Sequence, residues 1–150
     1  MSCYQVAKDF SPAVITFVIG LIASYIAFNQ YKVAHAKLKL DLFEKRYAIF
    51  EETWKFLSGV IQGDNASDPP IHPIMNLAPQ ASFLFGKDIE EYISLAHSNR
   101  IELARTERQI QPSNSEAIDR NAHLMNWFYN EASSGVKAVF SPYLDFDKWR

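Results

Sequence analysis

Hydrophobic positions near the N-terminus form one unbroken run. No charged residue occurs from Phe10 to Tyr31, a stretch of 22 positions. At a rise of about 1.5 Å per residue, such a helix crosses a hydrocarbon core of roughly 30 Å. A cleaved signal peptide is the competing interpretation, but the run is longer than the usual apolar region and no A-x-A site follows it. The pattern predicts a short extracytoplasmic tail at residues 1–9 and a transmembrane helix at residues 10–31, starting at Ser11 and Pro12.

Charges beside this run set its expected orientation. The N-terminal flank carries only Lys8 beside Asp9, whereas the C-terminal flank carries Lys32, Lys37, Lys39, Lys45 and Arg46. Because positive charge is retained on the cytoplasmic side of a membrane, residues 32–150 are predicted to be cytosolic. In a bacterium this places the chain in the inner membrane with its N-terminus outside.

Small and weakly polar residues recur every four positions within the run, at Thr16, Gly20 and Ser24. Small side chains let helix backbones approach closely, and hydroxyl groups can form hydrogen bonds between helices. We therefore expect this face to be an oligomerisation surface. The predicted partners are membrane lipid and further copies of this chain.

Beyond the run, apolar residues recur in steps of three and four, which predicts a helix near residues 32–61. Neither proline nor glycine interrupts the chain between Gly20 and Gly59, so this helix is expected to continue the transmembrane helix. The expected buried stripe consists of Val33, Ala36, Leu40, Phe43, Tyr47, Phe50, Trp54, Leu57 and Ile61, widened on one flank by Leu42, Ile49 and Phe56.

Two further helices are predicted after a loop at residues 62–73. The first, near 88–110, is expected to begin with a capping pair of Asp88 and Glu91 and to end before Pro112. Its apolar side contains Ile89, Tyr92, Ile93, Ala96, Leu103 and Ile110. The second, near 115–140, is expected to begin with Ser113 and Glu116. Its apolar side contains Ile118, Ala122, Met125, Tyr129, Ala132, Val136 and Val139.

No segment shows a sustained period of two, so the predicted fold class is all-α. Shorter sequence signals predict the remaining parts of the bundle. Pro79 is expected to break an apolar piece, Phe83 to Phe85 to pack, and Gly86 to end that piece. Ser141 and Pro142 are expected to stop the last helix. A tail is then expected to fold back on the bundle through Tyr143, Leu144, Phe146 and Trp149.

Composition and charge narrow the function classes. The chain is 48% hydrophobic and 21% charged with a formal net charge of -2, which suits a packed domain and argues against nucleic-acid binding. Cys3 is the single cysteine and precedes the apolar run, so the domain has no thiol for a disulfide or a zinc site. No cofactor is expected, and the four histidines show no metal-binding spacing.

Two groups of residues are candidates for chemical sites. Arg100, Arg105 and Arg108 form a candidate ligand-binding cluster for a phosphate or cyclic nucleotide, weakened by the acidic residues between them. Arg120 and His123 resemble the R-x(4–6)-H motif of helical ribonuclease domains of the HEPN type, but their spacing is too short. No catalytic constellation is recognised, so an enzyme is not expected.

Three segments resemble a group of uncharacterised bacterial single-pass membrane proteins. They are KLKLDLFEKRYAIFE at residues 37–51, FLFGKDIEEY at 83–92 and FSPYLDF at 140–146. This resemblance implies an architecture and no activity. In layout, the chain is also similar to small membrane effectors of RNA-guided antiphage systems.

The expected function is that of a homo-oligomeric, membrane-anchored assembly or interaction protein with a possible unidentified protein partner. A membrane-perturbing or pore-forming effector is the alternative, and a helical ribonuclease is the third candidate. The stripe that starts at Val33 and the small-residue face at Gly20 are roughly 100° apart on a continuous helix. A ring could use both surfaces, because each helix in a ring contacts two neighbours.

Overall fold

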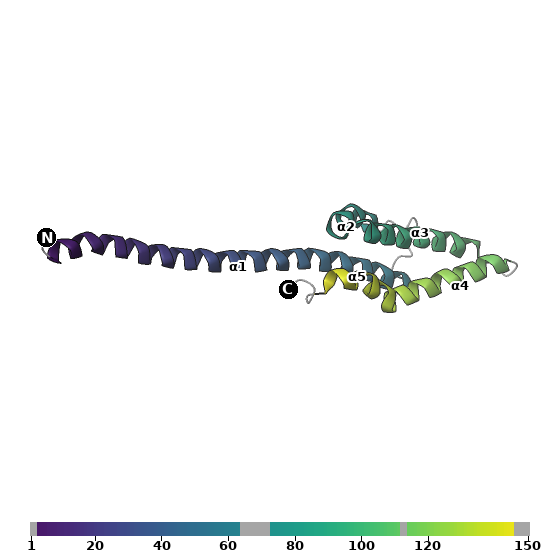
Figure 1. The fold of residues 1–150 in the computed structure, drawn as a ribbon. Helices are drawn as coiled ribbons and strands as arrows, with labels where there is room; N and C mark the ends of the chain where they lie inside the picture. Colours follow the sequence, from purple (N-terminus) through teal and green to yellow (C-terminus); the bar gives the residue numbers. More distant parts are fainter. Residues whose placement is uncertain (1–2, 64–72, 112–113, 146–150) are drawn as a thin grey trace. The chain divides into compact units, whose positions relative to one another are not determined.

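The computed structural model describes residues 3–63, 73–111 and 114–145, with side chains from residue 14 onward. Every element in these ranges is helical (Figure 1): α1 (Cys3–Gln62), the 3-10 helix η1 (Pro73–Leu77), α2 (Ala78–Phe85), α3 (Lys87–Gln109), α4 (Ser115–Asn130), the π-helical segment η2 (Glu131–Gly135) and α5 (Val136–Leu144). The described residues contain no strand, which confirms the predicted all-α class.

The chain divides into two compact units, Met1–Leu42 and Phe43–Arg150. The described part of the first unit is α1 alone. We call residues 43–145 the bundle; its compact unit begins at Phe43, whereas the sequence pattern places the start of the domain at residue 32. The predicted helix start at Ser11 and Pro12 is wrong, because α1 already begins at Cys3. A proline within a helix removes one hydrogen bond without necessarily ending the helix.

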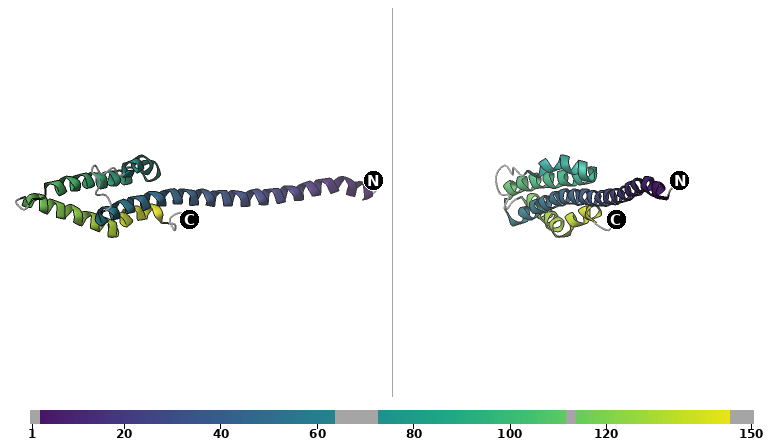
Figure 2. Two further views of the ribbon diagram at one scale, coloured as in Figure 1. Left: turned by 180° about the vertical axis from the view of Figure 1, so that it is seen from behind. Right: turned by 90° about the vertical axis from the view of Figure 1, so that its left-hand side faces the viewer.

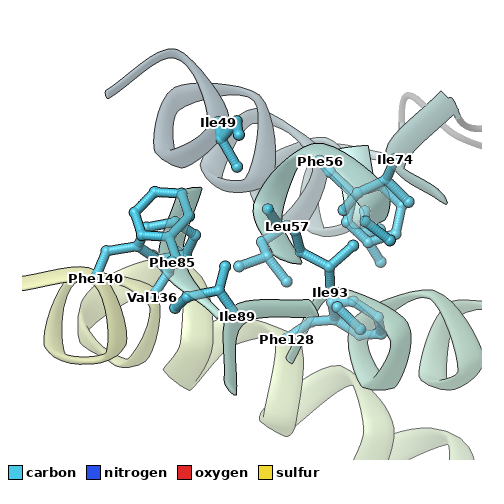
Figure 3. Packing of buried hydrophobic residues seen from close by; sticks show 14 of the residues in the cluster. Ile49, Phe56, Leu57, Ile74, Phe85, Ile89, Ile93, Phe128, Val136 and Phe140 are labelled. Carbon is cyan, nitrogen blue, oxygen red and sulfur yellow. The ribbon is translucent and has the colours of Figure 1, made fainter. Parts of the chain in front are cut away.

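Within the bundle, α2 and α3 lie on one side of residues 43–62 of α1, and α5 lies on the other (Figures 1 and 2). Apolar side chains from all of these helices and from α4 meet in one core (Figure 3). Phe56 from α1 and Phe128 from α4 meet edge to face with ring centroids 6.4 Å apart. Phe140 from α5 meets Phe85 from α2 in the same way at 5.3 Å. These contacts join elements that are distant in sequence.

The face of α1 that enters the core differs from the predicted stripe. The buried side chains are Ile49, Thr53, Phe56, Leu57 and Val60. Tyr47 and Trp54, in the middle of the predicted stripe, remain 46% and 45% exposed. The predicted flank contributes Ile49 and Phe56 to the core, and the predicted stripe contributes Leu57, with Phe50 and Ile61 packed partly buried against it.

The α2–α3 junction corrects three further expectations. Pro79 lies in the first turn of α2 and does not break it, because a first-turn proline lacks only an N–H that would have no partner within the helix. Phe83 does not pack and is 92% exposed. Gly86, at φ 97°, separates the helices and accepts a conformation that favours glycine. Consequently, α3 begins at Lys87 without a side-chain cap from Asp88.

The third predicted helix is interrupted in the structure. Its cap is Asn114, whose side-chain oxygen accepts a hydrogen bond from the Ala117 amide at 3.2 Å; Ser113 lies outside the described residues. The predicted apolar side is also wrong for α4, because Ile118 and Tyr129 are exposed. The side chains of α4 that are buried are those of Ala117, Leu124 and Phe128.

The helix continues through the expected stop at Ser141 and Pro142. Proline provides no N–H for the Ala138 carbonyl, but the Ser141 hydroxyl donates to that oxygen at 3.3 Å. Tyr143 and Leu144 therefore belong to α5 and pack against the core. The other two residues of the predicted tail, Phe146 and Trp149, lie outside the described residues.

Candidate functional surfaces

The first candidate surface is the uncovered apolar segment of α1. All side chains from residue 14 to residue 38 are exposed. Between residues 14 and 31, eleven of them are large and apolar: Val14, Ile15, Phe17, Val18, Ile19, Leu21, Ile22, Tyr25, Ile26, Phe28 and Tyr31. They follow one another around all sides of the helix. The described part of α1 therefore contains a segment that is long and apolar enough to cross a membrane.

The predicted small-residue face lies on this segment. Thr16, Gly20 and Ser24 are all exposed. A Cβ atom added at Gly20 would meet no atom within 4 Å, so a second helix could approach closely at this point. The end of the apolar run is marked by Lys32, whose Nζ lies 4.5 Å from the centre of the Phe28 ring.

The three arginines of the predicted ligand cluster have different surroundings. Arg100 is buried, and its Nη1 atom lies 3.6 Å from Oε2 of Glu107. Arg105 is exposed and lines a polar hollow, and Arg108 is exposed outside that hollow. The arginines are therefore not gathered on one open surface. Their role as a ligand site stays a prediction.

The polar hollow lies between the end of α3 and the start of α4 and has a volume of about 500 Å³. Its main ion pair joins Arg120 Nε to Glu102 Oε1 at 2.7 Å. The hydrogen bond from Arg120 lowers the pKa of Glu102, and the same bond raises the pKa of Arg120. With Glu116 and Arg105, the hollow is lined by two acidic and two basic side chains. Such a balance does not favour a strongly charged ligand.

The pairing of Arg120 also bears on the ribonuclease motif. The Arg120 side chain is engaged with Glu102, and His123 is exposed. Of the other histidines, His35 and His97 belong to different helices, and His72 lies outside the described residues. In the described ranges, no three His, Cys, Asp or Glu side chains are placed to hold a metal ion.

An aromatic groove that the sequence did not predict lies between α1 and α5. It has a volume of about 430 Å³ and is lined by Phe43, Tyr47, Phe50, Lys137, Ser141, Pro142, Leu144 and Asp145. Its aromatic wall is continuous, with ring centroids 5.9 Å apart between Phe43 and Tyr47 and 5.6 Å apart between Tyr47 and Phe50. The groove could accept an apolar side chain.

Arg46 has a structural role beside this groove. Its Nε donates to the Leu84 carbonyl at 2.9 Å, its Nη1 donates to the Tyr143 carbonyl at 3.3 Å, and its guanidinium lies 5.5 Å from the centre of the Phe85 ring. Both carbonyls belong to the last turns of helices and have no partner within the helix. Partial burial lowers the pKa of Arg46, and Tyr143 opposes this change. Arg46 therefore joins α1, α2 and α5, although its sequence position suggested a membrane flank.

The π-helical segment carries a polar contact with α3. The Tyr92 hydroxyl donates to Glu131 Oε2 at 2.7 Å, and burial together with this hydrogen bond raises the pKa of Tyr92. The Glu131 carboxylate folds over Gly135, where any Cβ atom would overlap with it. Trp54 Nε1 donates to the carbonyl of Ala132 at 3.1 Å, so the segment is held from a second side. No local sequence pattern indicates these contacts, because their partners are 39 and 78 positions apart in the chain.

Comparison with known proteins adds no relative: no protein-family model, curated protein or solved structure matches this chain. The surfaces described above are therefore interpreted from their own geometry and chemistry.

Proposed function

We propose that this protein is a single-pass, membrane-anchored helical interaction protein that self-associates and presents its bundle in the cytosol. The observation that supports the proposal is the ring of exposed apolar side chains around residues 14–31 of α1. A helix that is apolar on all sides requires burial in protein or in lipid. No other described segment of this chain covers it.

The size of the effect favours lipid strongly. Full burial of one large apolar side chain contributes about 1.5–3 kcal/mol. The eleven side chains are each roughly half to two-thirds exposed, so transfer of this segment into a bilayer gains on the order of 10 kcal/mol. Its backbone groups are already paired within the helix, as a hydrocarbon environment requires.

The orientation follows from the remaining basic flank. Arg46 is hydrogen-bonded within the bundle, but Lys32, Lys37, Lys39 and the exposed Lys45 still follow the apolar segment, against Lys8 on the other side. By the positive-inside rule the N-terminus lies outside and the bundle inside, at the bacterial inner membrane. The proposal assigns no reaction to the chain.

Extraction and fusion experiments test this proposal. The full chain is expected to remain in the membrane fraction after alkaline carbonate treatment. A fluorescent reporter fused after Arg150 is expected to be active, and an alkaline phosphatase fusion at the same point is expected to be inactive. Release by carbonate would refute the anchor, and an active phosphatase would refute the orientation.

The same preparation separates the interaction protein from the membrane-perturbing alternative. Reconstituted full-length chain in dye-loaded vesicles is expected to leave the dye inside if the chain only anchors and assembles. Leakage that rises with the protein-to-lipid ratio would favour the pore-forming effector, because an oligomer would then be opening a conducting path.

A further inference from the structure

We propose that a second copy of this chain docks in parallel along a heptad seam of α1, and that Asn29 pairs with its counterpart in that copy. The inference rests on the proposed function, because anchoring in the same membrane with the same orientation brings α1 helices side by side and parallel. It goes further by identifying the surface, its partner and the residue that sets the register.

The seam is a repeat of seven along the exposed part of α1. One line of the repeat is Ile19, Ile26, Val33 and Leu40, and the other is Ile15, Ile22, Asn29 and Ala36. All eight side chains are exposed. The seam runs for about 38 Å and spans more than three heptads, the length that indicates helix-to-helix packing. Residues 14–28 carry apolar or small side chains on all sides, so the repeat is distinguished from other registers by Val33, Ala36 and Leu40, which alternate with Lys32, Lys37 and Lys39.

A shallow hollow lies on the seam, where a side chain of a neighbouring helix can be seated. It has a volume of about 420 Å³ and is lined by Ile26, Asn29, Gln30, Val33 and Ala34. The first four residues are spaced i, i+3, i+4 and i+7. In knobs-into-holes packing, a side chain of one helix enters a hole formed by four residues of the facing helix, and this spacing forms such a hole.

The chemistry of Asn29 favours a second copy over an unrelated helix. An amide carries both donors and an acceptor, so two symmetry-related Asn29 side chains can satisfy each other. Asn29 is three residues before Lys32 and follows an apolar run in which an unpaired amide is unfavourable. A single asparagine among apolar seam residues also fixes register, because a shift of one heptad would place it against Ile22 or Ala36, neither of which can bond the amide.

Part of the same seven-residue repeat also remains exposed on the segment of α1 that belongs to the bundle. Tyr47 and Trp54 continue the line from Val33 and Leu40 at steps of seven, and both are about half exposed. Phe43 and Phe50 on the second line are partly covered, and both line the aromatic groove together with Tyr47. The bundle therefore uses only part of the stripe that the sequence pattern assigned to its core.

Cysteine cross-linking of the full chain in native membranes tests the seam. In a Cys3→Ser background, Ile26→Cys and Val33→Cys lie on the seam, whereas Phe28→Cys and His35→Cys lie on the opposite side and serve as matched controls. We expect at least five-fold more oxidised dimer at the two seam positions than at the two controls. Equal yields at the four positions would overturn the seam.

A second measurement tests the amide and the competing small-residue face. Asn29→Leu is expected to weaken association three- to thirty-fold, measured by energy transfer between labelled full-length copies as detergent is diluted, because the interhelical hydrogen bond is lost. Ser24→Leu, on the other side of the helix, is expected to leave association unchanged. The reverse pattern would assign the interface to Thr16, Gly20 and Ser24 and overturn the proposal.

A wild-type chain that stays monomeric over the whole range of detergent ratios would also overturn it. Carbonate extraction is performed on the same variants, so a failure of anchoring is recognised separately from a failure of docking.

Discussion

Removal of the Arg46 side chain is the most informative perturbation of the bundle. In the variant Arg46→Ala, two helix-terminal carbonyls lose their charged donor, and the contact with the Phe85 ring is lost. A hydrogen bond to a charged group contributes about 1.5–3 kcal/mol, and an exposed cation–π contact contributes about 0.5–1 kcal/mol. Because Arg46 is only partly buried, we discount these values and expect a loss of about 2–4 kcal/mol.

Thermal unfolding of the full chain in detergent, followed by circular dichroism at 222 nm, measures this loss. A change of this size lowers the midpoint of a bundle of this length by on the order of 10–20 °C. Arg46→Lys keeps the charge but not the planar fork, so about half of the loss is expected. Lys45→Ala is the matched control, because Lys45 is adjacent and exposed. Equal midpoints for Arg46→Ala and Lys45→Ala would refute the proposed role of Arg46.

Three further predictions concern η2, its contact with α3, and α5. Gly135→Ala should lower bundle stability by about 0.5–2 kcal/mol, because its Cβ displaces the Glu131 carboxylate from Tyr92, while alanine's better helix propensity offsets about 1 kcal/mol of that loss. In a Tyr92→Phe background the added loss should be smaller, and equal losses in chemical denaturation would contradict the coupling. Since the folded-state pKa of Tyr92 is raised, its contribution is complete below its unfolded pKa of about 10 and is lost as pH rises above that value. Denaturation midpoints at rising pH should therefore fall less for Tyr92→Phe than for the wild type. Ser141→Ala should destabilise α5 by about 0.5–1 kcal/mol, because the Ala138 carbonyl loses its donor. In a Pro142→Ala background the backbone N–H at position 142 can bond this carbonyl, so the same substitution should have a smaller effect. Thermal midpoints of the single and double variants check this.

The limits of sequence reasoning are clearest for the candidate surfaces. The apolar segment and the heptad positions could be predicted from the sequence, because both depend only on spacing along a single helix. The arginine cluster was not readable in this way: Arg100 became buried beside Glu107, while Arg105 joined a hollow that includes Arg120 of the next helix. The side of α3 that faces neighbouring helices determines which arginine is buried, and residue spacing alone does not specify that side.

The sequence by itself determined the helical class and the approximate positions of the three long helices. Glycine, proline and the three-to-four repeat act locally, so the helices near 32–61, 88–110 and 115–140 agree with α1, α3 and the α4–α5 segment. Even the main errors at helix ends are local, such as the cap at Asn114 in place of Ser113.

Only the tertiary structure decided which apolar stripe becomes core. On α1, the stripe with Tyr47 and the stripe with Phe56 are both adequate by composition, and the second is buried because side chains from η1, α2, α3 and α4 surround it. Arg46 reaches carbonyls 38 and 97 positions away, and Tyr92 reaches a carboxylate 39 positions away. Such contacts depend on how helices pack together, because a local pattern contains no information about which distant residues become neighbours.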